Sequence, residues 1–230
     1  MTTFLLPGEK ELFFVINGAH TPFMDGVMWL YSGMEIWVPL VLALLFTMMY
    51  KKSWREWALI LLSFVVLALV CDYVSAGLFK PWVQRPRPSG FPGVAELVWT
   101  LGERKIDSGS YGFISGHSTQ CFAIAMFSSL VFRKKLYTGV AFGWALIMGY
   151  SRIYLGAHFP GDVLGGMIAG MILAYVVYKL YRLAVAAGAK KGIFRTPVYA
   201  RNRIRNLSFG IIGYILLFSL LSPWLVPLFK

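Results

Sequence analysis

The sequence is poor in charge, in cysteine and in histidine. Of its 230 residues 14% are charged and 58% are hydrophobic, a composition that excludes an ordinary soluble globular domain. The two cysteines, Cys71 and Cys121, each lie inside an apolar run, so we expect core residues and neither a disulfide framework nor a zinc cluster. The first residues lack the pattern of a cleavable signal peptide, and the whole chain is therefore interpreted as mature.

The sequence is instead dominated by long apolar runs. A hydrocarbon layer of about 30 Å needs roughly 20 apolar residues in a helix. Runs of about this length predict an all-α integral membrane protein, a bundle of about six transmembrane helices. The runs are 26–50, 54–79, 115–132, 136–155, 160–181 and 207–228. We expect one membrane-embedded domain over 1–230, with an interfacial segment at 1–25, a motif-bearing core at 54–181, a basic cytoplasmic loop at 182–206 and a last span at 207–230.

The charge is strongly one-sided, with 22 Lys and Arg against 10 Asp and Glu and a net charge of +12. Most of this excess lies in the segments 51–55, 133–135 and 179–205, which separate alternate pairs of runs. Because Lys and Arg accumulate in short cytoplasmic loops, the excess predicts topology and needs no nucleic-acid partner. The loops 80–114 and 151–162 then lie on the non-cytoplasmic side. Binding of anionic lipid headgroups by 179–205 is an alternative.

The first outer loop opens with a strip of cations. Between Lys80 and Pro88, three prolines forbid a continuing helix and hold Lys80, Arg85 and Arg87 in an extended segment. This arrangement favours an anion clamp. The alternative is a cluster at a helix end whose cations reach the interface, with Trp82 as an aromatic anchor.

The same loop ends with Ser115, Gly116 and His117, directly before an apolar run. Serine is a good N-cap, glycine permits close approach of the backbone, and a helix N-terminus binds phosphate through its free N–H groups. The pattern indicates a phosphate seat with a histidine beside it. A capped helix with an incidental histidine is the alternative.

The second outer loop places His158 just before Pro160 and Asp162 just after it. Proline suits the first turn of a helix, so the histidine precedes that helix and the carboxylate lies inside its first turn. A carboxylate there can accept the proton of one imidazole nitrogen and leave the other free to attack. Alternatively, the aspartate only favours the helix N-terminus. His20 has no such context and is assigned no role.

Together these segments resemble the type 2 phosphatidic acid phosphatase family, membrane lipid phosphatases that share their phosphate site with the vanadium haloperoxidases. The first family motif, Lys, six residues and Arg-Pro, corresponds to 80–88. The second, Pro-Ser-Gly-His, corresponds to 114–117 with Ile114 in place of proline, and the third, Ser-Arg, five residues, His, three residues and Asp, is complete at 151–162. The resemblance covers roughly 54–181.

The resemblance implies that His158 is the nucleophile and forms a phosphohistidine, that Asp162 orients it, and that His117 protonates the leaving oxygen and later activates water. The residues implied to hold the phosphoryl oxygens are Lys80, Arg87, Ser115, Gly116 and Arg152. Fixed cations and a helix N-terminus can stabilise a phosphoryl transition state without a metal, so no metal and no cofactor are expected.

Further charged residues have weaker assignments. Arg85, Arg104 and Lys105 are candidate contacts to a headgroup, with ordinary solvated loop charges as the alternative. Asp72 and Glu35 lie in apolar runs, where an ionisable group is costly and is a candidate for function or for pairing with a cation.

The sequence therefore predicts a metal-independent phosphatase that acts on a phosphorylated membrane lipid. Undecaprenyl pyrophosphate and a lipid A phosphate are favoured substrates, and phosphatidylglycerol phosphate and phosphatidic acid are further candidates. We expect a bacterial cytoplasmic (inner) membrane, with the active site toward the periplasm or exterior. The alternative function is a non-enzymatic transporter or lipid-binding scaffold. The oligomeric state is not predicted.

Overall fold

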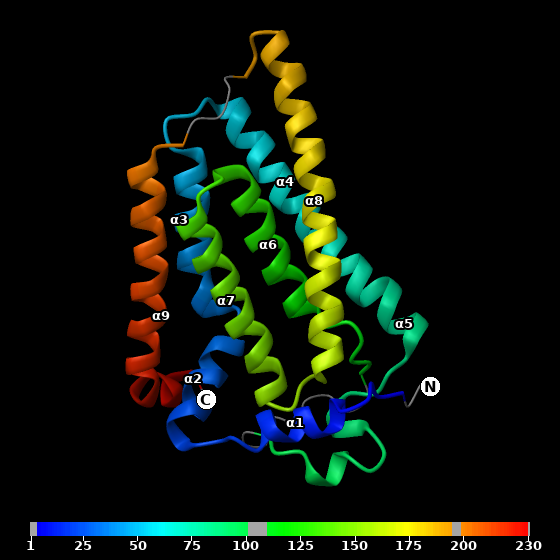
Figure 1. Ribbon diagram of the computed structural model, residues 1–230. Helices are drawn as coiled ribbons and strands as arrows, with labels where there is room; N and C mark the ends of the chain where they lie inside the picture. The colour runs from blue at the N-terminus through cyan, green and yellow to red at the C-terminus, as the bar shows by residue number, and fades with distance from the viewer. Residues whose placement is uncertain (1–3, 101–109, 195–198, 230) are drawn as a thin grey trace.

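A computed structural model describes residues 4–100, 110–194 and 199–229 (Figure 1). Within these ranges the chain forms helices and no strands, which confirms the all-α prediction. The α-helices are α1 (Glu9–Asn17), α2 (Pro22–Ser32), α3 (Val38–Met49), α4 (Trp54–Asp72), α5 (Lys80–Val83), α6 (Gly116–Phe132), α7 (Lys135–Tyr154), α8 (Pro160–Lys190) and α9 (Arg201–Phe229). Short 3₁₀ segments are η1 (Glu35–Trp37), η3 (Pro88–Gly90) and η4 (Ala95–Leu97), and η2 (Tyr73–Phe79) is π-helical and continues α4 into α5.

Local sequence fixes where several helices begin. Ser53 and Glu56 form a capping box at the start of α4, in which Glu56 Oε2 accepts the Ser53 N–H at 2.9 Å and Ser53 Oγ accepts the Glu56 N–H at 3.4 Å. Thr21 caps α2 directly before Pro22. These caps satisfy N–H groups that the first turn of a helix leaves without partners.

By length and apolar composition, three helical stretches can cross a membrane: Trp54–Val83, Pro160–Lys190 and Arg201–Val226. The helices α2 and η1–α3 are bent by 72° relative to each other at the break between them. They add a fourth span if this bent pair crosses the membrane as one broken span. Within the run expected over 26–50, the backbone leaves the helical conformation at Gly33, so two helices and not one straight helix cover this run. The helices α6 and α7 lie among these helices (Figure 1), and a total of six spans stays a prediction.

The basic segment between the last two helices is more helical than expected. α8 continues to Lys190 and α9 already begins at Arg201, so the loop predicted over 182–206 is helical at both ends. The upper end of α8 projects beyond the neighbouring helices in Figure 1. Charged residues limit the length of a buried apolar run, but they do not end a helix that continues into water.

The backbones of α6 and α8 approach closely because α8 carries glycines on the shared face. A Cβ on Gly166 would lie 2.6 Å from the carbonyl oxygen of Ser115, and one on Gly170 would lie 2.2 Å from that of Thr119. Small residues permit this kind of contact between helices in a membrane. The close approach places the N-terminus of α6 directly beside that of α8.

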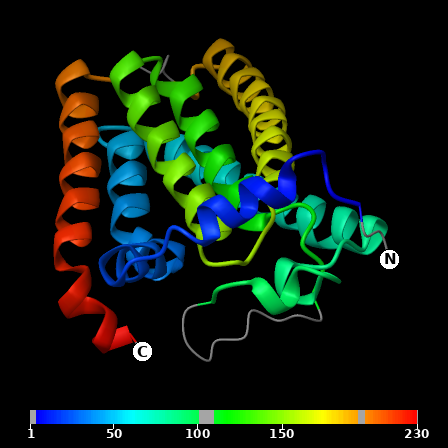
Figure 2. The same cartoon turned by 60° about the horizontal axis from the view of Figure 1, so that its bottom comes forward.

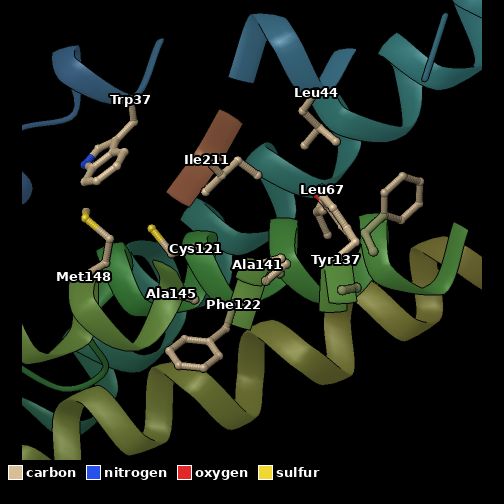
Figure 3. Close-up of a cluster of buried hydrophobic side chains, with 14 of the residues drawn as sticks. Trp37, Leu44, Leu67, Cys121, Phe122, Tyr137, Ala141, Ala145, Met148 and Ile211 are labelled. Carbon is tan, nitrogen blue, oxygen red and sulfur yellow. The ribbon is translucent and has the colours of Figure 1, made fainter. Parts of the chain in front are cut away.

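A large apolar cluster fills the middle of the bundle (Figure 3). Trp37, Phe122, Tyr137 and Met148 of this cluster are each at most 2% exposed. Cys71 and Cys121 belong to the same cluster and are unpaired, which confirms the prediction that both are core residues.

The two ends of the bundle differ in character. The turns at 51–53 and 133–134, the C-terminal end of α8 and the N-terminal end of α9 lie toward the upper end in Figure 1, and the segments that carry the motifs lie at the lower end. α1 crosses this lower end, over the turn between α7 and α8 (Figure 2). The basic segments and the motif-bearing loops are therefore separated as the charge pattern predicts.

Candidate active site

A cavity of about 270 Å³ opens among the motif residues at the lower end of the bundle. Three cations and two histidines share it, although they come from segments far apart in the sequence. The residues that line it are Met34, Asp72, Ser75, Ala76, Lys80, Arg87, Gly116, His117, Gln120, Arg152 and His158. The positive side chains outnumber the single carboxylate, so the cavity has the electrostatic character of an anion site.

His158 and Asp162 form a buried pair across the start of α8. His158 is 2% exposed, and its Nδ1 lies 3.4 Å from Oδ2 of the fully buried Asp162. The Phe159 N–H donates to the same carboxylate oxygen at 3.0 Å. Because the carboxylate faces Nδ1, this arrangement favours a proton on that nitrogen and leaves Nε2 with a free lone pair.

The environment of His158 favours the neutral imidazole. Burial lowers the pKa of His158 to about 4, against the attraction of the Asp162 carboxylate, and the nearby Arg87 and Arg152 act in the same direction as burial. A neutral imidazole is the form that can act as a nucleophile. The site therefore favours the neutral form of this histidine at neutral pH.

The segment 115–117 begins α6 at the edge of the cavity. Ser115 is the N-cap, and its Oγ accepts hydrogen bonds from the Ser118 N–H at 3.4 Å and from the Ser118 hydroxyl at 3.2 Å. Gly116 and His117 line the cavity, whereas Ser115 is fully buried behind it. The structure thus gives Ser115 a capping role in addition to its predicted role as a phosphate contact.

The predicted phosphate-binding cations approach the cavity from three elements. Lys80 begins α5, Arg152 lies in the last turn of α7, and Arg87 follows the turn after α5. Arg87 Nε donates to Ser110 Oγ at 2.7 Å, and Arg152 NH1 donates to Ser32 Oγ. Within the described part of the chain, the buried Nε of Arg152 has no hydrogen-bond partner, so this guanidinium retains a donor.

Arg85 has a different position from the one predicted. It is 6% exposed, with NH1 at 2.9 Å from Asp162 Oδ1 and NH2 at 2.8 Å from Glu9 Oε2. A guanidinium held by two buried carboxylates is not available to a headgroup, which corrects the contact considered for Arg85. The other two candidates, Arg104 and Lys105, lie outside the described residues.

Sequence reasoning gave no role to Glu9 and left that of Asp72 undecided. Glu9 lies in the segment interpreted only as interfacial, and no spacing rule connects it to a site more than a hundred residues away. Asp72 lines the cavity together with Lys80, a proximity that their separation of about two helical turns already suggested. Among the described residues, no group of three or more His, Cys, Asp or Glu has the arrangement of a metal site.

Comparison with known proteins gives a consistent result. A family model described as the PAP2 superfamily matches residues 57–185. A lipid A 4'-phosphatase from Porphyromonas gingivalis is 36% identical over 99% of this chain and 96% of its own length. A second lipid A 4'-phosphatase, from Bacteroides thetaiotaomicron, is 31% identical over 77% of this chain and 79% of its own.

The fold also has a counterpart among solved structures. The crystal structure of a transmembrane PAP2-type phosphatidylglycerolphosphate phosphatase from Bacillus subtilis matches with a TM-score of 0.56 at 24% identity. The match covers 77% of this chain and 86% of that one. At this level of identity the likeness concerns the fold.

Proposed function

Because the chain belongs to the PAP2 superfamily, we propose that it is an integral membrane phosphatase that removes phosphate from lipid A, acting through a phosphohistidine on His158. The observation that carries this proposal is the cavity in which His117, His158 and the three cations Lys80, Arg87 and Arg152 meet. The preference for lipid A rests on the two lipid A 4'-phosphatases that the chain resembles over most of its length. Undecaprenyl pyrophosphate is the second candidate, since an undecaprenyl-diphosphatase from Bacillus subtilis is 28% identical over 74% of this chain.

The reaction proceeds in two displacements at phosphorus. In the first, Nε2 of His158 forms a bond to phosphorus while the bond to the lipid oxygen breaks. His117, which carries a proton when the phosphate dianion is bound among the cations, gives that proton to the lipid oxygen. In the second, His117 takes a proton from water, the water oxygen attacks phosphorus, and the bond to His158 breaks to release inorganic phosphate. Phosphoryl transfer places negative charge on three equatorial oxygens, and Lys80, Arg87 and Arg152 stabilise it.

The site faces away from the cytoplasm in this proposal. Support comes from the opposite placement of the basic segments and the motif-bearing loops along the bundle (Figure 1). In a bacterium with two membranes, the active site then lies at the periplasmic face of the inner membrane. A phosphate on a lipid headgroup reaches such a site without crossing the hydrocarbon layer.

The test uses purified protein and a panel of lipid phosphates. Wild type is compared with His158→Ala and with His20→Ala, which removes the one histidine outside the cavity. We expect phosphate release from lipid A by wild type and His20→Ala and none by His158→Ala. Mass spectrometry of the product establishes which phosphate leaves. Equal phosphate release by His158→Ala would contradict the assignment of His158 as the nucleophile. Faster hydrolysis of undecaprenyl pyrophosphate than of lipid A would identify undecaprenyl pyrophosphate as the substrate instead.

A further inference from the structure

Arg85 connects the N-terminal helix α1 to the carboxylate behind the nucleophile. Its two terminal nitrogens pair separately with Glu9 and with Asp162, at 2.8 and 2.9 Å. The three side chains are 7%, 2% and 0% exposed for Arg85, Glu9 and Asp162. Two buried carboxylates thus share one guanidinium, an arrangement that is costly to desolvate and stable only while its contacts are complete.

The contacts of Asp162 divide between its two oxygens. Oδ1 accepts from Arg85, and Oδ2 accepts the Phe159 N–H and faces His158 Nδ1. Arg85 therefore fixes the rotation of the carboxylate that presents Oδ2 to the imidazole. The Phe159 ring supports Arg85 from one side, with the guanidinium carbon 4.7 Å from the ring centroid.

Glu9 is anchored as firmly as the residues that it contacts. Its Oε1 accepts the Gly161 N–H at 2.7 Å, and its Oε2 also accepts the Leu6 N–H at 2.8 Å. A Cβ on Gly161 would lie 2.6 Å from Glu9 Oε1, so only glycine leaves room for this approach. Glu9 thus binds both the start of α8 and the arginine that holds Asp162.

Further contacts of α1 hold Glu9 in this position. Phe13, one turn further along the helix, is fully buried against Phe159, with ring centroids 5.2 Å apart. Asn17, a further turn along, donates to the carbonyl oxygens of Trp99 and Tyr154 at 2.8 Å each. One face of α1 is therefore packed against the segments that surround the cavity.

From this geometry we infer that Glu9 and Arg85 are positioning residues, which act through Asp162 to hold the His158 imidazole in its reactive tautomer and orientation. The kinetic part of this inference rests on the proposed function. It makes α1, a segment with no counterpart in the three motifs, a working part of the active site. Loss of Arg85 leaves two buried carboxylates without a counter-charge, and a carboxylate that takes up a proton or rotates no longer accepts from Nδ1.

The kinetic test compares four single variants. We expect Arg85→Gln to lower kcat about 100-fold with KM changed less than about twofold, since misplacement of a reacting group affects the chemical step. Arg85→Lys keeps the charge and is expected to recover part of the loss, and Glu9→Gln is expected to give a smaller fall. Glu11→Gln is the matched control, because it makes the same change on the exposed face of α1.

Two results decide whether these residues act through Asp162. In an Asp162→Asn background, Arg85→Gln should cause little further loss, because residues that act as a unit are not additive. A full additional 100-fold loss would overturn the inference, as would a change confined to KM. Thermal unfolding of each variant is measured in parallel. If Arg85→Gln does not fold, Arg85→Lys and Glu9→Gln provide the same comparisons.

A readout without substrate separates this inference from the proposed function. The chain has three histidines, so ¹⁵N-histidine spectra are simple, and His158→Gln identifies the signals of His158. We expect Nδ1 of His158 to carry the proton in wild type and Glu11→Gln, and the other tautomer to increase in Arg85→Gln. An unchanged tautomer would reject the positioning role. A wild type that hydrolyses no phosphate ester would reject the proposed function, while the spectra still test the inference.

Discussion

The backbone N–H of Ser115 donates a 3.0 Å hydrogen bond to the carbonyl oxygen of Asp162. This bond joins the residue that caps α6 to the first turn of α8, and it brings together two of the three motifs. Both helices direct their N-termini to the same end of the bundle, so their partial positive charges add to those of Lys80, Arg87 and Arg152 near the cavity. The positive charge around the cavity thus comes from backbone and side chains together.

Replacement of His117 is expected to affect substrates according to their leaving groups. If His117 protonates the departing oxygen, His117→Ala should lower kcat for a lipid phosphate about 100-fold or more. For p-nitrophenyl phosphate, whose leaving group departs without a proton, attack by His158 should be much less affected. Steady-state rates on both substrates check this expectation. Equal losses on both would contradict the role of a general acid.

The rate should depend on pH through His158. The folded-state pKa of about 4 lies below the ordinary value of 6.5, so the imidazole stays neutral as the pH falls from 7 to 5. We expect the acid limb of kcat/KM to have its midpoint well below 6.5, near 4, with about a tenfold loss per pH unit below it. The loss should reverse on return to pH 7. A midpoint at 6.5 would show that the imidazole is not desolvated in the free enzyme.

The same depressed pKa has a consequence for stability. The unfolded chain binds a proton at His158 near pH 6.5, whereas the folded protein binds it only near pH 4. The contribution of neutral His158 to the free energy of unfolding is therefore complete above pH 6.5, and it decreases as the pH falls toward 4. His158→Gln is expected to weaken the acid sensitivity of thermal unfolding over this window. An identical pH dependence in wild type and variant would contradict the linkage.

Phosphate release should continue in the presence of EDTA. Lys80, Arg87 and Arg152 line the cavity and can supply the positive charge that a metal provides in other phosphatases. Rates with excess EDTA, with added Mg²⁺ and with neither should agree. A strict requirement for a divalent cation would contradict the assignment of charge stabilisation to these side chains.

The contact between α6 and α8 should tolerate no side chain at Gly170. A Cβ there would lie 2.2 Å from the Thr119 carbonyl oxygen, so Gly170→Ala must push the two backbones apart. Overpacking of this kind costs about 1–3 kcal/mol. We expect a lower unfolding temperature in detergent and a reduced kcat, because the shift reaches both histidines.

The matched control for Gly170→Ala is Gly143→Ala in α7. A Cβ on Gly143 has no atom within 4 Å, so the substitution should leave stability unchanged or raise it slightly. If both variants lost the same stability, the effect would come from the helix backbone in general and not from the contact with α6.

Local patterns of the sequence determined the helical class and many of the motif positions. Apolar runs between basic segments predict helices in a membrane, and Pro160 and Ser115 mark helix starts where the structure has them. The motif spacings also indicated which side chains would meet: Lys80, Arg87, His117, Arg152 and His158 all line one cavity. These features depend on neighbours in sequence or on a recurring family pattern, so the sequence alone contains them.

The bend at Gly33 and the length of α8 were not predictable in the same way. An apolar run allows a straight helix and a broken one equally, and packing against neighbouring helices selects between them. Likewise, charged residues show where a helix can leave the hydrocarbon layer but not where it ends. For this reason three or four helices of the described chain satisfy the length and composition of a membrane span, whereas the apolar runs predicted about six.

Arg85 and Arg87 show most clearly what tertiary structure decided. Two residues apart in one proline-rich strip, they look equivalent in the sequence. In the folded chain Arg87 lines the cavity, whereas Arg85 turns to Glu9 and Asp162. The sequence determined that this loop would carry cations close to a phosphate site. Which cation lines the cavity and which is buried between carboxylates depends on how α1 packs against α8, because a buried charge takes its partner from whatever distant segment the fold brings within reach.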